Sequence, residues 1–414
     1  MNDETNAPSE TTLSAESKKN VTKANGLLRS GLLVSVMTMM SRVLGLVRDI
    51  VLAAVLGGVA SGGQAGAFYV AFKVPQFLRR LFAEGAFAQA FVPVLSEYQE
   101  QKNRAQVREL IDKVNGALTL SLLCVVLLGV LGSNVLTHIV APGFIDQPNK
   151  FAMTESLLKI TFPYLLLISL AGFLGSILNS NDRFVAPAFT PIWLNVCLIA
   201  AGMFYAEFTD SPATALAYGI LIAGFVQLFF LMPFVYRLGL FPRFNFDLSH
   251  PGVKRILTLM LPALLGVSVA QVNLVIDTIL ATNLPDGSIA WLYFSQRISD
   301  LPLGVFAIAI STVILPTLSR QFANNNESKF APTLDWGVRF VLMIAVPSVI
   351  ALCVLAQPIL TSLFLYGKTT QLDIVMASHS LQAYSIGIIF FMLIKILVPG
   401  YFARQDMKTP VRIA

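Results

Sequence analysis

The sequence predicts an all-α polytopic membrane protein in which about ten transmembrane helices form two pseudo-repeat lobes around a central cavity. Hydrophobic residues make up 55% of the 414 residues and charged residues only 13%, whereas an average soluble chain carries about 25% charged residues. Apolar stretches long enough to cross a bilayer recur along the chain, and part of the second half repeats the first. Because so few charges cannot cover a soluble surface, lipid must solvate much of this one.

The first 26 residues are polar and rich in Ser, Thr, Asn, Glu and Lys. They lack the basic-then-apolar pattern of a cleavable signal peptide. A segment of this composition cannot bury enough apolar surface to fold by itself, so it predicts a disordered cytoplasmic tail over residues 1–26.

Ten apolar stretches follow the tail, and each is long enough to cross the hydrocarbon core. Several contain proline or glycine, as at Pro75, Gly85, Pro93, Pro302 and Pro316. Membrane helices tolerate such breaks where neighbouring helices or a wet cavity satisfy the freed backbone groups. The predicted spans are 31–57, 65–98, 111–137, 152–179, 186–206, 213–236, 256–282, 289–320, 333–356 and 375–400.

The loops predict the orientation through their lysines and arginines. If the N-terminus is cytoplasmic, every loop lysine and arginine except Lys150 and Lys368 lies on the inner side. The net charge of +6 is then mostly this topology signal. It implies contact with membrane lipids, and it requires no nucleic-acid partner.

The chain repeats itself weakly, with a common offset of 223–228 residues, so spans one to four correspond to spans seven to ten. Two such halves, related by an axis along the membrane normal, form a recurring transporter plan with the substrate site between them. We therefore expect one lobe over residues 27–240 and a second over 241–414. The matching segments are 46–53 with 274–281, 93–96 with 316–319, and Asp182 and Pro187 with Asp406 and Pro410.

The first lobe has two more spans after Pro187, whereas the sequence of the second ends at Ala414. Relative to this architecture we expect at least two further spans, so the chain is expected to be C-terminally truncated. The alternative is an asymmetric protein with ten spans.

Span one carries a polar stripe about 120° wide at 100° per residue. Its opposite face is Leu, Val, Ile and Met. Each charged group at mid-bilayer costs roughly 2.5–3.5 kcal/mol on insertion scales, so the stripe must face water, protein or an anionic ligand. The alternative is a buried Arg–Asp network that only holds helices together. The stripe consists of Thr38, Ser41, Arg42, Gly45, Arg48 and Asp49.

Span two places Lys73, Gln76, Arg80 and Glu84 on one face, with Arg79 about 100° away. Because proline and glycine in this span can bend or rotate the helix, periodicity leaves open which arginine faces the cavity. The alternative for either arginine is that it snorkels to a membrane interface.

Span eight repeats the pattern, with Tyr293, Gln296, Arg297, Asp300 and Gly304 on one face. Arg297 and Asp300 are one turn apart, so the alternative there is a simple intrahelical pair.

Asp277 is an isolated acid in span seven. It has three interpretations: it binds a cation, it titrates, or it pairs with a partner that the sequence does not identify.

Spans one, two and eight carry more positive than negative charge. Such a surplus in a low dielectric is unfavourable unless an anion enters. The planar fork of arginine fits phosphate oxygens. The residues therefore predict a cationic cavity for a phosphate- or pyrophosphate-bearing molecule. The cations are Arg42, Arg48, Lys73, Arg79, Arg80 and Arg297, and the acids are Asp49, Glu84 and Asp300.

The sequence gives no sign of enzymatic chemistry. Cys124, Cys197 and Cys353 lie in apolar runs without metal-ligand spacing, and the three histidines are isolated. We also find no acidic cluster of the kind that an enzyme acting on polyprenyl phosphates would need. A transporter without an organic cofactor is therefore expected.

Several motifs, from about residue 27 to the end, resemble the MurJ (MviN) family. The resemblance implies a bacterial inner-membrane lipid II flippase of the multidrug/oligosaccharidyl-lipid/polysaccharide exporter superfamily, a fold with fourteen spans, and a monomer that moves its undecaprenyl-pyrophosphate-linked precursor outward by alternating access. The alternative is another exporter of that superfamily, for drugs or for other polyprenyl-linked oligosaccharides. The motifs are MMSRVLGLVRD at 39–49, AFKVPQFLRRLFAEGAF at 71–87, ITFPY at 160–164, LLGVSV at 264–269, LDWG at 334–337 and RQDMKTP at 404–410.

The family's cavity arginines map onto Arg42, Arg48, Arg79 and Arg297, which favours Arg79 over Arg80. Ser41 and Glu84 also fall on family positions. Where many members have an acid, this chain has Gly66 and Gln296. The resemblance suggests a sodium ion or the membrane potential as the driving force, and Asp277 is the one sodium ligand that carries over.

Overall fold

The chain is predominantly helical in the part that the computed structural model describes, which comprises residues 10–59, 62–80, 86–209, 211–324, 327–404, 406 and 408–413. No strand occurs in these ranges. The expected all-α class is therefore confirmed.

The first half of the chain forms nine α-helices within the described residues. Asn103 and Gln106 close a capping box at the start of α4, and Pro148 and Pro212 occupy first helical turns, where a missing N–H costs nothing. The helices are α1 (Glu10–Leu56), α2 (Gln64–Leu78), α3 (Phe87–Gln101), α4 (Arg104–Leu131), α5 (Ser133–Val140), α6 (Pro148–Thr161), α7 (Tyr164–Asn179), α8 (Val185–Ala200) and α9 (Pro212–Arg237).

The second half is built in the same way. Thr370 and Asp373 form a capping box at the start of α15, and a π-helical turn, η6 (Leu303–Ala307), follows Pro302. The α-helices are α10 (Pro251–Thr282), α11 (Ser288–Pro302), α12 (Ile308–Ala323), α13 (Glu327–Val354), α14 (Ala356–Phe364), α15 (Gln371–Ala403) and α16 (Lys408–Ile413).

The expected number of ten spans stays a prediction. Among the described residues, six helical segments are long and apolar enough to cross a membrane. Helix α1 carries Arg42, Arg48 and Asp49 along its apolar part, and α11 is only 15 residues long. The expected span 65–98 is divided between α2 and α3, with residues 81–85 outside the described ranges. The six segments are Arg104–Leu131, Pro148–Asn179, Val185–Tyr205, Pro212–Arg237, Ser328–Val354 and Gln371–Ala403.

The N-terminal tail differs from the sequence prediction. Residues 10–26, expected to be disordered, form the first turns of α1. Neither proline nor glycine lies between Glu10 and Asn25, so nothing in the covalent chain interrupts the helix there.

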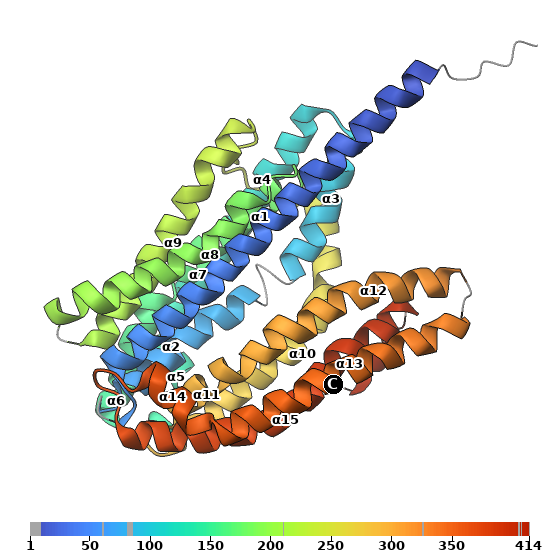
Figure 1. Cartoon of the computed structure of the whole chain (residues 1–414). Helices are drawn as coiled ribbons and strands as arrows, with labels where there is room; N and C mark the ends of the chain where they lie inside the picture. The colour runs from blue at the N-terminus through green and yellow to red at the C-terminus, as the bar shows by residue number, and fades with distance from the viewer. Residues whose placement is uncertain are drawn as a thin grey trace, which may run out of the picture.

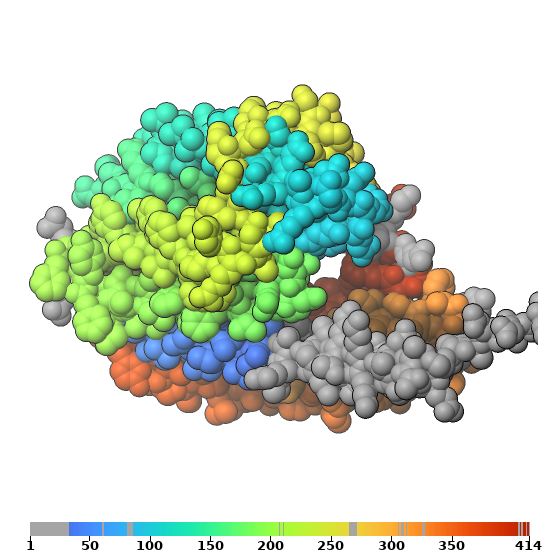
Figure 2. All heavy atoms as spheres, turned by 90° about the horizontal axis from the view of Figure 1, so that it is seen from above, coloured from blue at the N-terminus to red at the C-terminus, as the bar shows by residue number. Residues whose placement is uncertain are grey.

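The helices pack into two groups. In one group α1 lies along α8, α8 and α7 pack on α9, and α2 packs on α6; in the other, α11, α12, α13 and α14 surround α15. Figure 1 shows the groups diverging toward the N-terminal end of α1 and meeting at the opposite end, near α6 and α14. Seen from above, the green and cyan segments form one mass and the orange and red segments another (Figure 2). The expected lobe limits remain a prediction.

Buried aromatic side chains join the two groups between the cavity and their closed end. Tyr69 of α2 stacks on Tyr293 of α11 with ring centroids 4.3 Å apart, and it meets Phe294 of α11 edge-on at 6.5 Å. Such pairs contribute about 0.5–1.5 kcal/mol beyond their buried area. The site described below is therefore held between packed elements of both halves.

The segment that connects α9 to α10 is fastened to α4. The Arg243 backbone N–H donates to Asp112 (2.7 Å), and Lys113 pairs with Asp247 (3.2 Å). Gly116 permits the approach, because a Cβ there would lie 2.4 Å from the Asn245 carbonyl oxygen. The connecting segment therefore follows the first group of helices.

Acid is expected to release this connecting segment. The Ser249 backbone N–H and Lys113 donate to Asp247 and lower the pKa of its carboxyl below the ordinary 3.8. Because the folded pKa is depressed, the contribution is complete above pH 3.8 and is lost as pH falls through the folded pKa. Hydrogen exchange of residues 241–249, corrected for intrinsic rates, should speed up in that window, and Asp247→Asn should show the faster exchange already at pH 7. Equal protection in the variant and the parent would contradict this.

Candidate functional site

A cavity of about 590 Å³ lies between the two groups of helices, and charged side chains enter an otherwise largely apolar wall. Its walls come from α1, α2, α5, α8, α10 and α11. Six cationic side chains line it, while the acids described in or directly behind its wall are Asp300 and Asp49. The cavity is therefore strongly positive within the described residues. The cations are Arg42, Arg48, Lys73, Arg79, Arg80 and Arg297.

Helix α1 presents its polar stripe to this cavity. Ser41, Arg42, Gly45 and Arg48 line the wall, as the 100° spacing predicts. The opposite face is exposed on the outside of the molecule, where a bilayer would contact it. The exposed apolar residues are Met39, Met40, Val43 and Val47.

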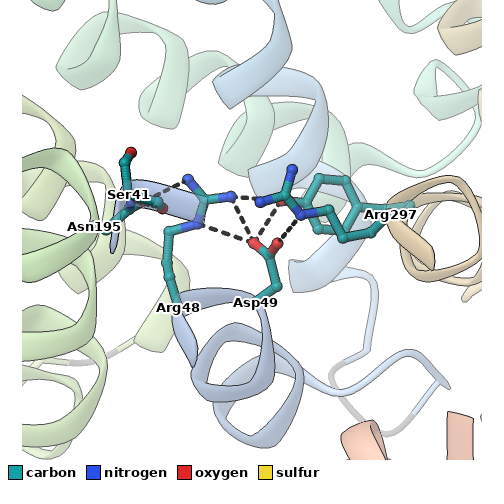
Figure 3. Close-up of polar contacts among 6 residues, drawn as sticks. Ser41, Arg48, Asp49, Asn195 and Arg297 are labelled. Carbon is teal, nitrogen blue, oxygen red and sulfur yellow. Dashed lines mark hydrogen bonds and ion pairs between the residues drawn. The ribbon is translucent and has the colours of Figure 1, made fainter. Parts of the chain in front are cut away.

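Asp49 is shared by two arginines from different halves (Figure 3). Its Oδ1 accepts from Arg48 Nη2 at 2.6 Å, and its Oδ2 pairs with Arg297 Nε at 2.5 Å. Asp49 is fully buried, and Arg48 is 8% exposed. The structure thus contains the buried Arg–Asp network that the sequence offered as an alternative. In this network a single carboxylate contacts two guanidinium groups. Arg297 pairs with Asp49, and not with Asp300 as in the alternative of a simple intrahelical pair.

Two neutral side chains complete this network, and neither was among the candidate site residues. Asn195 of α8 accepts from Arg48 Nη1 (3.0 Å) and donates to the Ser41 carbonyl oxygen (3.0 Å). The Tyr293 hydroxyl donates to Asp49 Oδ1 (2.8 Å) and accepts from Arg48 Nη2 (3.2 Å). The sequence signal for Asn195 was that it is an asparagine within the apolar run of α8. The signal for Tyr293 was its position on the polar face of span eight.

Small residues let the arginines reach across the interface. A Cβ on Gly45 would lie 2.6 Å from Arg297 Nη2, and a Cβ on Gly304 would lie 2.6 Å from Arg42 Nη1. Glycine at these positions therefore leaves room for a guanidinium group against the backbone of the facing helix.

Gly45→Ala should impair the site without removing a charge. The new methyl group would lie 2.6 Å from Arg297 Nη2, so the guanidinium group must shift. A misplacement of about 1 Å is enough to cost up to about 100-fold in rate. The displacement is measurable in a structure of the variant. Gly387→Ala is a matched control, since the contact there is an ordinary 3.4 Å to the side chain of Phe391 on the same helix. Equal activity of G45A and the parent would mean that Arg297 does not need this position.

Helix α2 brings Lys73, Gln76, Arg79 and Arg80 to the cavity. Both arginines, which directly follow α2, line it, and the chain is π-helical at residues 79–80, where the angular spacing between successive side chains differs from that of an α-helix. Lys73 Nζ also donates to Thr278 Oγ1 of α10 at 3.3 Å. Glu84 lies outside the described residues.

The remaining candidates divide between two spaces. Gln296 and Asp300 of α11 line the main cavity. Asp277 does not; it lines a neighbouring space of about 20 Å³ together with Lys73, Gln296 and Tyr384. Among the described residues, no group of three or more His, Cys, Asp or Glu side chains is placed to hold a metal ion. Sodium binding at Asp277 stays a prediction.

The sequence matches the family described as "Lipid II flippase MurJ" over residues 52–414. A protein from Vibrio cholerae named "Probable lipid II flippase MurJ" is 47% identical over 399 residues, covering 95% of this chain and 75% of that protein. The chain belongs to the MurJ family. A Burkholderia cenocepacia protein named "Lipid II flippase MurJ" is 38% identical over 392 residues, which cover 94% of this chain and 75% of the relative.

Solved structures agree with MurJ membership. A structure titled "Lipid II flippase MurJ, inward closed conformation" matches with a TM-score of 0.80 and 28% identity, covering 92% of this chain and 78% of that one. An inward-facing MATE family multidrug transporter matches with a TM-score of 0.62 and 14% identity, covering 90% and 86%. The second likeness shows a common fold only. The cationic cavity thus lies in a MurJ fold.

Proposed function

We propose that this chain moves lipid II, the undecaprenyl-pyrophosphate-linked peptidoglycan precursor, from the inner to the outer leaflet of the bacterial inner membrane. The observation that carries the proposal is the arginine pair, Arg48 and Arg297, which shares one buried carboxylate at the wall of a cationic cavity. Membership of a family whose relatives are named lipid II flippases supports the same substrate.

The diphosphate is the part of the substrate that this cavity recognises. Arg48, Arg79 and Arg297 bind its oxygens, while Arg42 adds to the local positive field. Guanidinium groups bind phosphate oxygens through two parallel hydrogen bonds, which fixes orientation as well as charge. The incoming anion replaces Asp49 as a partner of the two arginines, so that binding alters the contact between the halves.

Translocation proceeds by alternating access without covalent chemistry. Lipid II enters from the inner leaflet between α1 and α11, its polyprenyl tail remains in lipid, and its sugar–peptide head occupies the cavity. The two groups of helices then rock around the bound diphosphate. The divergence of the helices toward the N-terminal end of α1 supports an inner opening, if that terminus is cytoplasmic (Figure 1).

The driving force is proposed to act on the charges of the cavity. A membrane potential contributes about 2.3 kcal/mol per charge per 100 mV, and six cationic side chains line the cavity. The alternative is a sodium ion at Asp277. We also propose that the protein acts as a monomer and that its N-terminus is cytoplasmic.

Export of cationic drugs is the second candidate, favoured only by the fold shared with a MATE family transporter. A site for cationic drugs needs acidic side chains, whereas the described lining of this cavity has six cationic side chains and one acid, Asp300. Transport of another polyprenyl-linked oligosaccharide would use the same diphosphate site.

Depletion of the resident lipid II flippase in a Gram-negative host tests the proposal. Expression of the full chain should restore growth and the exposure of lipid II on the outer leaflet, measured by cleavage with an externally added enzyme specific for lipid II. A chain that inserts in the membrane but restores neither would refute lipid II transport. Restored export of a different polyprenyl-linked sugar would identify the alternative substrate.

A further inference from the structure

The two halves are fastened together at the end opposite the N-terminus of α1. The Lys368 backbone N–H donates to the Ala54 carbonyl oxygen (2.8 Å), and the Val59 N–H donates to Asp373 Oδ1 (3.0 Å). Each bond joins the end of α1, or the loop after it, to the region where α15 begins. Any motion that opens the cavity at this end must break them.

One ion pair crosses the same boundary. Lys150 of α6 bonds through Nζ to Asp286 Oδ1 in the loop between α10 and α11. Among the described residues, this is the ion pair that joins the halves at the closed end. Its members differ in environment, since the side chain of Lys150 is 8% exposed and that of Asp286 is 44% exposed.

The Lys150 side chain also contacts residues of its own half. The ammonium lies over the Phe144 ring, 4.0 Å from the centroid. Its stem passes over Gly63, where a Cβ would lie 2.9 Å from Lys150 Cδ. Gly63 has φ +88°, a conformation that favours glycine. These contacts within the first half therefore hold the lysine side chain in the position from which it reaches Asp286.

We propose that Lys150 and Asp286 form a latch that holds this end of the transporter closed and opens in each transport cycle. When the halves part, Lys150 keeps its cation–π contact with Phe144, so the buried cation is never left without a favourable neighbour. Asp286 is already half-hydrated and moves into water. The ion pair therefore favours the closed conformation, and it can still break when the two halves separate.

Distances between the halves test the latch. Spin labels replace Phe208 and Leu372, which are exposed on opposite halves, in a variant whose three cysteines are substituted. Pulsed electron paramagnetic resonance on the full chain in lipid nanodiscs reports the distance distribution. Asp286→Asn removes the charge of the exposed partner, and the population with separated ends should rise about fivefold.

A second variant redirects the lysine and leaves Asp286 intact. A Cβ on Gly66 would lie 3.4 Å from Lys150 Cε, an ordinary contact distance, so the first carbon of a side chain is accommodated beside the lysine. Gly66→Asp gives Lys150 a carboxylate within its own half, and it should increase the separated population as D286N does. Asp146→Asn, an exposed acid in the same region, is the control and should change nothing.

Unchanged distance distributions in both D286N and G66D, with each protein inserted and monodisperse, would overturn the latch. A similar increase in D146N would also overturn it, because the effect would then come from general surface charge. The measurement needs no substrate. Its result is therefore independent of whether the chain carries lipid II.

Discussion

Arg48→Ala and Arg297→Ala are each expected to reduce lipid II transport by about 10- to 150-fold while the protein still inserts in the membrane. The estimate follows from the loss of charge-assisted hydrogen bonds to the diphosphate, each worth about 1.5–3 kcal/mol. Lipid II exposure in the depleted host, normalised to the amount of inserted protein, measures the effect.

Two further variants separate charge from geometry. Arg48→Lys keeps the charge but loses the planar fork, so it should restore only part of the activity. Arg255→Ala removes an arginine whose pair with Glu97 is exposed, and it should transport normally. If R48A and R297A both transport as well as R255A does, the diphosphate does not bind between these arginines.

Asp49→Ala is expected to lower the stability of the protein by about 3–5 kcal/mol, because removing one partner of a buried ion pair leaves the other charge uncompensated. Arg48 would keep Asn195 and Tyr293 as neutral partners. Arg297 adds less to the loss, because its side chain is 33% exposed and water can replace the carboxylate. Unfolding in detergent, followed by helical circular dichroism, measures the change.

A surface pair provides the matched control for Asp49. Asp335 and Arg339 are 2.8 Å apart, close to the 2.6 Å between Arg48 and Asp49, but their side chains are 56% and 79% exposed. Asp335→Ala should therefore cost only about 0–1 kcal/mol. Similar losses for D49A and D335A would show that burial of Asp49 does not strengthen its contribution.

The polar stripe of α1 could be predicted from the sequence because α1 is one uninterrupted helix. A constant 100° per residue then fixes which side chains share a face, and Ser41, Arg42 and Arg48 do line the cavity. The same spacing could not separate Arg79 from Arg80. The π-helical turn at those residues changes the angle, and the sequence gives no measure of it.

The partners of the site residues could not be predicted because they come from distant segments. Asn195 lies 147 residues after Arg48, and Tyr293 lies 244 residues after Asp49. Which residues meet depends on how α1 packs against α8 and α11, and no local pattern records that packing. Spans interrupted by glycine or proline were also predicted as single helices, such as the pair α4 and α5, which separate at Gly132.

The shared carboxylate of Asp49 also bears on the part of the cycle in which nothing is carried. After each substrate is released, the transporter must return to its starting conformation without substrate. In that step, two guanidinium groups that face each other without a counter-anion would repel and would resist closing. The Asp49 carboxylate is a counter-anion that removes this repulsion. The substrate-free protein can therefore complete the return step without binding an anion from the cytoplasm. The affinity for the substrate is correspondingly reduced, because its diphosphate must compete with the Asp49 carboxylate for the two arginines.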